Sequence, residues 1–344
     1  MTTIADALAF IAAHETPWPR DLRAHLDSGY FDPPPDNTPV GPVHPRGPVN
    51  AIITQRGQVL GTTGDTKQVD QTFSVAKSYL SMLTGIAVGD GLIPDIDRPV
   101  RELVDDGGFD SAQNAGITWR HLLTNTSEWE GELFGKSDLI DRGRTLSREG
   151  SGPKRSTRAL QPPGTYWEYN DVRVNRLGLS LLRVFRRPLP EVWAERVMKP
   201  IGASETWKWE GYDTAWVEVD GKRMQSVPGG THWGGGVSIC AEDQLRVVQM
   251  AANDGVWEGK RILPEGWVKA SITPCALNPH YGFLYWLNTG RTKWPAASEG
   301  AFTFSGAGGA TCWVEPAEGL VCVFRWLNPE HLNEAMRLVR AAAA

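Results

Sequence analysis

The sequence lacks the features that define several common protein classes. It has few cysteines, and none form a C-x-x-C pair, which excludes a disulfide scaffold and predicts free thiols. It contains no basic run of five or more residues, and its formal charge is -5, which argues against nucleic-acid binding. It also has no uncharged apolar run of about 18 residues, so no transmembrane helix and no membrane partner are predicted.

Several catalytic signatures are missing as well. The seven histidines form no H-E-x-x-H or other close pair, so we expect no metal and no cofactor. The nucleophile elbow G-x-S-x-G of the α/β-hydrolases is absent. Gly131–Ser137 resembles a P-loop but has three residues between its glycines instead of four. Residues 1–19 include Asp6 and no basic start, which makes a poor signal peptide and predicts a cytoplasmic protein.

Hydrophobic periodicity predicts an α/β sandwich. A helix over residues 4–13 precedes a Pro-rich passage, and two β-rich runs at 49–54 and 58–62 form a hairpin around Arg56-Gly57. The last third predicts strands over 281–287, 301–304, 311–315 and 320–326, followed by a helix over 330–343. Further helices are predicted over 73–88, 117–123, 172–185, 191–198 and from 241. Strands at both chain ends with helices between them imply one antiparallel sheet built from both termini and flanked by helices.

These elements suggest three regions. Residues 1–45 form an N-terminal helix and a Pro-rich lead-in. Residues 46–90 and 210–344 form the α/β sandwich domain. Residues 91–209 form a mainly helical domain, and within it residues 130–163 make a long loop excursion.

The pattern Ser74-Val75-Ala76-Lys77 has the clearest chemical meaning. At positions i and i+3 of a helix, the hydroxyl and the amine share one face, so Lys77 can accept the proton of Ser74. The alternative is a helix-capping serine beside an unrelated lysine. The sequence contains a second S-x-x-K match at 151–154, but its Gly and Pro forbid the helix that would align the two side chains.

Three other segments are candidates for a site. Tyr169-Asn170-Asp171 places a phenol and two polar side chains before a helix, where Asn170 or Asp171 could equally be an ordinary cap. Ser305-Gly306-Ala307 ends a strand with small residues, where a backbone N–H could reach a developing oxyanion. The Gly-rich stretch 229–236 contains His232 and Trp233 and could line a cleft, although a purely structural histidine is the plainer interpretation.

Taken in order, these motifs resemble those of the serine β-lactamase and penicillin-binding-protein superfamily, especially its class C-like, esterase-type branch. S-x-x-K at 74, Y-x-[ND] at 169 and a strand-end [ST]-G motif at 305 follow the superfamily's order. The connecting segments 117–127, 199–206 and 234–243 are similar to that branch too. Its relatives include family VIII carboxylesterases and hydrolases of nylon-oligomer amides.

The resemblance implies a β-lactamase/transpeptidase-like fold and a role for each matching residue. Ser74 would be the acylated nucleophile, Lys77 its base and Tyr169 the proton shuttle to the leaving group. The backbone N–H groups of Ser74 and Ala307 would form the oxyanion hole. Asn170, Asp171, Ser305 and Gly306 would support the site or bind substrate, and the glycine-rich stretch adds His232 and Trp233 as further candidates for that role.

Two positions depart from the family pattern. Asp171 stands where the family usually has Asn, so its contact would be ionic and could raise the pKa of Lys77. Phe304 stands where the third motif has Lys or His, so the cation that would meet a β-lactam or peptide carboxylate is missing. This argues for esters or amides without that carboxylate.

We therefore expect a serine hydrolase that forms an acyl-enzyme on Ser74 and hydrolyses small esters or amides without a cofactor. The alternatives are an acyltransferase with the same acyl-enzyme, a weak β-lactamase or D-amino-acid peptidase, and a penicillin-binding-like module without turnover. The sequence leaves open whether the protein is a monomer or a homo-oligomer.

The 15 tryptophans, against 10 Phe and 7 Tyr, are unusual. Those in segments that surround the cleft in the resembled fold are Trp129, Trp167, Trp207, Trp209, Trp233, Trp286 and Trp294. Those expected away from it are Trp18, Trp193, Trp257 and Trp267. We therefore predict an aromatic-walled, weakly charged pocket.

Overall fold

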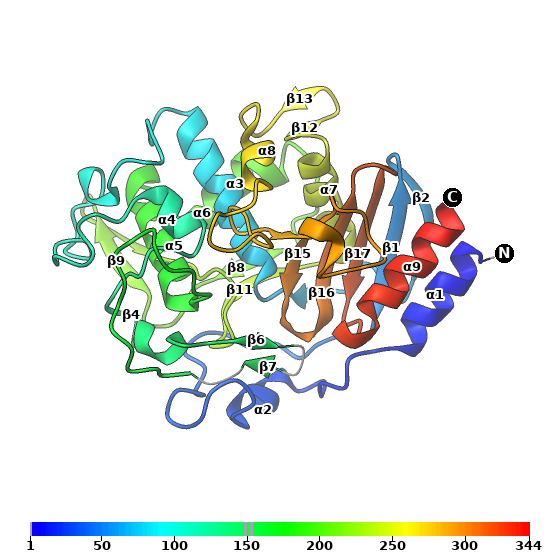
Figure 1. The fold of residues 1–344 in the computed structure, drawn as a ribbon, viewed down its shortest axis with the longest axis horizontal. Coiled ribbons are helices and arrows are strands. Elements are labelled where there is room, and N and C mark those ends of the chain that lie inside the picture. Colours follow the sequence, from blue (N-terminus) through cyan, green and yellow to red (C-terminus); the bar gives the residue numbers. More distant parts are fainter. Residues whose placement is uncertain (1, 148–149, 152–153) are drawn as a thin grey trace.

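The centre of the molecule is an antiparallel sheet of six strands in the order β14-β15-β16-β17-β1-β2 (Figure 1). The computed structural model describes residues 2–147, 150–151 and 154–344. The strands of the sheet are β1 (Asn50–Gln55), β2 (Gln58–Thr63), β14 (Trp286–Leu287), β15 (Phe302–Gly306), β16 (Ala310–Glu315) and β17 (Leu320–Arg325). Because β1 pairs with β17, the two ends of the chain are joined in one sheet, as the sequence predicts.

Alternation along each strand divides the apolar residues between the two faces of the sheet. In β1, Ala51 and Ile53 belong to one core cluster and Ile52 to the other. In β17, Cys322 lies opposite Ile53 and Val323 opposite Ile52, so the paired strands present the same kind of residue to the same face. Both faces are therefore buried and both need a helical layer.

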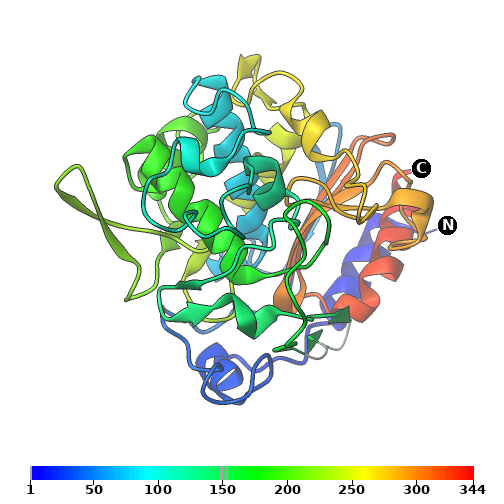
Figure 2. The ribbon, with the colours of Figure 1, turned by 60° about the vertical axis from the view of Figure 1, so that its left-hand side comes forward.

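Helices cover the two faces. Figure 2 shows α1 and α9 side by side against one face, near both chain ends. Helices α3 and α7 pack on the other face. The helices are α1 (Ile4–Ala13), α2 (Leu22–Asp27), α3 (Val75–Gly89), α4 (Trp119–Leu123), α5 (Asp171–Phe185), α6 (Leu189–Trp193), α7 (Ala241–Ala252), α8 (Trp267–Ser271) and α9 (Leu332–Ala343).

Helix α3 is the central helix of the fold. Nearly all of its residues are buried, because it packs against α5 on one side and against the sheet on the other. A helix that is apolar on all sides in this way belongs in a core. Its first turn is therefore fixed from several directions, and that turn begins directly after Ser74.

Helices α4 to α8 and most of the short strands lie between α3 and the last strands of the chain. A second sheet has the order β3-β11-β8, in which β3 (Asp70–Gln71) comes just before α3, and β8 (Lys208–Glu210) and β11 (Gly236–Ile239) come after it. The other short strands form pairs: β4 (Glu132–Leu133) with β5 (Lys136–Ser137), β6 (Leu146–Ser147) with β7 (Gly150–Ser151), β9 (Trp216–Val219) with β10 (Lys222–Gln225), and β12 (Val256–Trp257) with β13 (Lys260–Arg261). The excursion 130–163 is largely irregular where it is described. Residues 152 and 153 of the second S-x-x-K match lie outside the described residues. The division of the chain into domains stays a prediction.

Several predicted boundaries differ from the structure, and two of the differences have a clear physical reason. The strand expected over 281–287 is reduced to Trp286–Leu287, because Leu284 takes a left-handed φ of +64° that breaks the extended chain. The last helix begins at Leu332 and not at Glu330, since a short 3₁₀ turn over Pro329–His331 precedes it.

Candidate active site

Ser74 and Lys77 lie one helical turn apart at the start of α3 and contact each other. The Nζ of Lys77 donates to the Oγ of Ser74 at 2.9 Å and to the carbonyl of Gly229 at 3.2 Å. The hydroxyl of Ser74 donates to the carbonyl of Gly230 at 3.2 Å. Lys77 is buried and Ser74 is partly exposed. The hydroxyl therefore faces solvent, and the amine donates to it from the protein interior.

Close backbone contacts hold Ser74 from two sides. Phe73, directly before it, has a φ of +49°, a conformation that costs a non-glycine residue about 1–2 kcal/mol. A Cβ on Gly230 would lie 1.7 Å from the carbonyl oxygen of Phe73, and one on Gly306 would lie 2.0 Å from that of Thr72. Only glycine fits at these two positions, which allows β15 and the 229–236 stretch to approach the turn that carries Ser74.

Asp171, at the start of α5, forms ion pairs with two cations. Its carboxylate lies 2.7 Å from the Nζ of Lys77 and 3.0 Å from a guanidinium nitrogen of Arg144. Burial alone would raise the pKa of Asp171, but Lys77 and Arg144 outweigh it and hold the pKa well below its usual range. Burial alone would lower the pKa of Lys77, but the Asp171 carboxylate outweighs it and the pKa is raised. Lys77 is therefore an ammonium at neutral pH.

Tyr169 lies across from this pair. Its ring stacks on that of Trp286, with centroids 5.8 Å apart and planes inclined by 21°. The Nζ of Lys77 lies 5.1 Å from the ring centroid, and the guanidinium carbon of Arg144 lies 5.2 Å from it. The phenol thus stands between an aromatic wall and two cations, which attract its π face.

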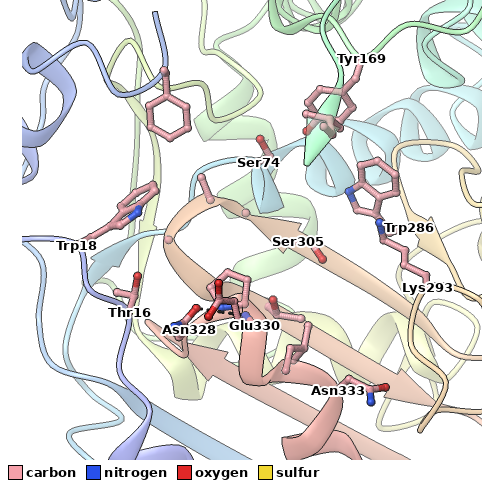
Figure 3. A pocket seen from close by; sticks show the side chains of 18 of the residues that line it. Thr16, Trp18, Ser74, Tyr169, Trp286, Lys293, Ser305, Asn328, Glu330 and Asn333 are labelled. Atoms are coloured by element: carbon pink, nitrogen blue, oxygen red, sulfur yellow. Dashed lines mark hydrogen bonds between the residues drawn. The ribbon is translucent and has the colours of Figure 1, made fainter. Parts of the chain in front are cut away.

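Of the residues described above, Ser74, Arg144, Tyr169 and Trp286 border a cavity of about 480 Å³. Figure 3 shows Ser74 between Trp18 on one side and Trp286 on the other, with Ser305 close by. The cavity is lined by Thr16, Pro17, Trp18, Tyr30, Phe31, Ser74, Arg144, Leu146, Tyr169, Trp286, Lys293, Trp294, Ser305, Gly306, Ala307, Gly308, Thr311, Asn328, Pro329, Glu330, Leu332 and Asn333. A volume of this size suits a small organic molecule.

The structure brings most of the expected catalytic residues to this cavity. Ser74, Tyr169, Ser305, Gly306 and Ala307 line it. Lys77 is buried directly behind Ser74. Gly306 closes β15 and Ala307 follows it, next to the backbone of residues 72–74.

Other expected site residues lie outside the cavity. Phe304 is fully buried and packs edge-on against Tyr285, because alternation along β15 turns it away from the side to which Ser305 points. Asn170 is the N-cap of α5, where its side chain accepts from the backbone N–H groups of Val172 and Arg173. Asn170 does not line the cavity.

His232 and Trp233 lie behind Asp171 and not on the cavity wall. His232 contacts Asp32 through Nε2, and its Nδ1 lies 3.5 Å from Asp171. The indole N–H of Trp233 donates to Asp32 at 3.1 Å. Both side chains are buried, so they act on the cavity only through Asp32 and Asp171, the charged residues that they contact.

The tryptophan assignments need correction. Trp286 and Trp294 line the cavity as expected, whereas Trp129, Trp167, Trp207, Trp209 and Trp233 do not. The prediction that Trp18 lies away from the cavity is wrong: it is one of the lining residues. The walls also include the charged residues Arg144, Lys293 and Glu330, so the pocket is aromatic but not weakly charged.

A network of buried charges was not foreseen from the sequence. Lys154 pairs with Asp32 at 2.6 Å and with Asp141 at 2.9 Å. Asp141 lies 3.5 Å from Arg144 and accepts the backbone N–H of Asp171 at 2.9 Å. Asp141, Arg144 and Lys154 belong to one excursion of the chain, whereas Asp32 and Asp171 lie far from it in sequence. No local pattern marks the network, because its long-range contacts form only when these segments fold together.

The described part of the chain contains no group of three His, Cys, Asp or Glu placed to hold a metal ion. Among the same residues, no helix is long and apolar enough to cross a membrane. The cysteines are free, as expected.

Comparison with known proteins identifies the family. The family model described as Beta-lactamase matches residues 46–343, so the chain belongs to that family. The fold is that of the β-lactamase and penicillin-binding-protein superfamily, as its motifs suggested.

Individual relatives are distant. Protein Rv1367c of Mycobacterium tuberculosis is 26% identical over 245 residues, and the match spans 59% of this chain and 60% of that protein. Among solved structures, a putative beta-lactamase from Bacteroides dorei has a TM-score of 0.62 at 17% identity, covering 92% of this chain and 96% of that one. EstCE1, "a hydrolase with promiscuous acyltransferase activity", has a TM-score of 0.61 at 17% identity, covering 99% and 100%.

Proposed function

We propose that the protein is a serine hydrolase that forms an acyl-enzyme on Ser74 and hydrolyses small esters or amides. The observation that carries the proposal is the 2.9 Å hydrogen bond from Lys77 to the Oγ of Ser74 at the edge of the cavity. A serine activated by a neighbouring lysine is an established alternative to the Ser-His pair. Membership of the Beta-lactamase family supports the same chemistry.

In the proposed reaction, Oγ of Ser74 attacks the carbonyl carbon of the substrate while its proton passes to Lys77. The backbone N–H groups of Ser74 and Ala307 donate to the developing oxyanion. Tyr169 transfers the proton to the leaving alcohol or amine as the bond to the carbonyl carbon breaks. Water then attacks the carbonyl carbon of the acyl-enzyme and loses a proton to Lys77 or Tyr169. The bond from that carbon to Oγ of Ser74 breaks, Oγ takes the proton back, and the acid leaves.

This scheme sets a condition on protonation. Because Asp171 keeps Lys77 charged at neutral pH, Lys77 must lose a proton before it can accept one from Ser74. We therefore expect the rate of acylation to rise with pH on the alkaline side of neutrality.

A fluorophosphonate probe tests the nucleophile. We expect the probe to add one phosphonyl group to Ser74, detected by mass spectrometry of the digested protein, and to leave Ser74→Ala unlabelled at that position. Turnover of 4-nitrophenyl esters should fall by several orders of magnitude in Ser74→Ala and Lys77→Met. An unlabelled Ser74 in a folded wild type, or full activity in Ser74→Ala, would show that the proposal is incorrect.

Acyl transfer is the second candidate. It rests on the structural similarity to EstCE1, whose description includes promiscuous acyltransferase activity. The acyl-enzyme would be the same, with an alcohol or amine replacing water as the second nucleophile. Chromatography of the products formed in the presence of a competing alcohol separates the two: a new ester indicates transfer, and free acid alone indicates hydrolysis.

A further inference from the structure

The N-terminal segment supplies one side of the candidate active site. Trp18, Tyr30 and Phe31 line the cavity, although they precede the residues that match the family model. Trp286 and Trp294 line it as well, and Figure 3 shows Trp18 and Trp286 on opposite sides of Ser74. Groups on either side of a substrate carbonyl held at Ser74 would thus meet different aromatic walls.

Trp18 also contacts residues next to both expected oxyanion donors. Its ring meets that of Phe73 edge-on, with centroids 5.7 Å apart, and Phe73 directly precedes Ser74. On the other side it lies against Gly308, where a Cβ would be only 3.0 Å from the indole. Gly308 directly follows Ala307, and Ala307 packs against the same small cluster. The Trp18 side chain therefore packs between the Phe73 side chain and Gly308, on the two segments whose N–H groups must converge.

Several bonds hold Trp18 in this place. The guanidinium of Arg46 donates to the carbonyl of Trp18 at 3.0 Å and pairs with Glu15 at 2.5 Å. The backbone N–H of Thr16 donates to the carbonyl of Trp326 at 2.7 Å. The segment is thus tied to the end of the central sheet, and Trp18 itself is 9% exposed.

The three aromatic rings of this segment form flat, uncharged walls. Trp18 and Phe31 lie edge to face with centroids 5.6 Å apart, and so do Tyr30 and Phe31 at 4.9 Å. The His25 ring lies tilted against those of Trp18 and Tyr30, with centroids 4.5 Å apart in each pair. Burial lowers the pKa of its imidazole, which keeps it neutral at neutral pH. Rings in such arrangements favour another ring as a neighbour, because the edge of one meets the π face of the next.

We propose that Trp18 positions the oxyanion hole and that Trp18, Tyr30 and Phe31 bind a planar aromatic group of the substrate. The inference rests on the proposed function, since it needs an ester or amide held at Ser74. It adds a class of substrate, an aryl ester or aryl amide, and it gives the N-terminal segment a part in catalysis.

The positioning role is tested with Trp18→Leu and Trp18→Phe. Displacement of an oxyanion donor should lower kcat of Trp18→Leu about 10- to 100-fold on methyl acetate, a substrate too small to need the aromatic walls. Trp18→Phe keeps a ring against Phe73 and Gly308 and should recover most of kcat. Affinity for a boronic acid that mimics the tetrahedral intermediate should fall in parallel with kcat/KM. Trp257→Leu is the matched control, because it replaces a tryptophan that does not line the cavity. Its kcat and its affinity for the boronic acid should equal those of wild type.

The substrate class is tested with matched pairs of planar and non-planar esters. Methyl phenylacetate is compared with methyl cyclohexylacetate, and phenyl acetate with cyclohexyl acetate, so that the ring lies in the acyl group or in the leaving group. The planar preference is kcat/KM for the planar ester divided by kcat/KM for its non-planar partner. We expect Tyr30→Leu to reduce this ratio about threefold to tenfold in one of the two pairs. Tyr30 is 41% exposed and contributes little to the core, so the variant should keep the fold, and thermal unfolding checks this.

The outcomes separate this inference from the proposed function. Equal kcat in Trp18→Leu and wild type, with Ser74 still labelled by the fluorophosphonate, overturns the positioning role alone. An unchanged planar preference in both ester pairs for Tyr30→Leu overturns the aromatic site alone. Failure of Ser74 to react in the wild type would remove the proposed function itself.

Discussion

A single buried ion pair sets the ionisation of the candidate base. Asp171 and Lys77 lie 2.7 Å apart, and both side chains are almost completely shielded from solvent. Carboxylate and ammonium stabilise each other there, so the lysine remains charged unless the solution is alkaline. An asparagine at this position, as the family usually has, would keep a polar contact without the charge. The aspartate therefore makes the site dependent on pH.

Asp171→Asn tests this dependence. The Asp171 carboxylate raises the pKa of Lys77, so its removal lowers that pKa and makes neutral Lys77 available at lower pH. We expect the rising limb of the plot of kcat/KM against pH to move toward acid, with more of the maximal activity retained near pH 6. Ser74→Ala is the zero-activity control, and Tm of each variant reports the cost of leaving Arg144 less well paired. A limb that stays in place would mean that Lys77 is not the titrating base.

At the scale of elements, the site depends on the meeting of β15 with the start of α3. The strand ends at Gly306, whose α-carbon lies against the backbone of Thr72 and Ser74. The φ of Gly306 is -125°, so any residue could adopt its conformation. Glycine is required at position 306 only because there is no space for a Cβ atom. Any side chain there must push the strand end away from the nucleophile.

Gly306→Ala should therefore impair the reaction. A Cβ at this position would lie 2.0 Å from the carbonyl oxygen of Thr72 and 3.2 Å from the backbone nitrogen of Ser74, so the strand and the helix must separate. Since misplacement of about 1 Å can cost about a hundredfold, we expect kcat/KM to fall by roughly that factor. Gly300→Ala is the matched control, because a Cβ there meets nothing within 4 Å. Steady-state kinetics that leave Gly306→Ala unimpaired would contradict the expected crowding.

The elements themselves were largely predictable from the sequence. Periodicity located α1, α3 and α5 and the β1–β2 hairpin, because each has one strong apolar pattern bounded by Gly, Pro or a capping residue. Strands at both chain ends predicted one sheet built from both termini, and the pairing of β1 with β17 is how the structure joins them. Helical spacing also singled out Ser74 and Lys77, because the second S-x-x-K match contains Gly and Pro, and the family resemblance added their catalytic roles.

The walls of the cavity were not predictable in the same way. Trp18 lies in an irregular segment, and no periodic pattern tells where such a segment folds back. Phe304 was assigned by its place in a motif, but alternation along β15 buries its side chain in the core. Arg144 and Lys154 pair with the nearby Asp141, but their partners Asp171 and Asp32 come from distant parts of the chain. Local sequence carries no information on these distant contacts.

At the scale of the whole molecule, the buried charges tie distant segments together around the site. Asp32 follows the N-terminal aromatic residues, Lys154 belongs to the excursion, and His232 follows the glycines that contact Ser74. Lys77 and Asp171 add α3 and α5 to the same network. Buried ion pairs contribute little when intact but are costly to break, since one charge is then left without its partner. The assembly of the site is therefore sensitive to the ionisation of its carboxylates.

Acid unfolding should reveal this coupling through Asp32. Burial alone would raise its pKa, but His232 and Lys154 lower it from 3.8 to about 2. The unfolded chain thus binds a proton that the folded chain does not, and the stabilisation, present above pH 3.8, is lost as pH falls toward about 2. Asp32→Asn should cost at least about 2 kcal/mol in the free energy of unfolding at pH 7.

The difference between Asp32→Asn and wild type should narrow as the pH is lowered from about 5 toward 2, because wild type loses the ionic contribution that the variant never had. Urea denaturation at pH 7, 5 and 3 measures it. Asp213→Asn, at an exposed position, is the control and should follow wild type at each pH. An Asp32→Asn deficit of the same size at pH 3 and pH 7 would show that the charge of Asp32 does not hold the N-terminal segment against the site.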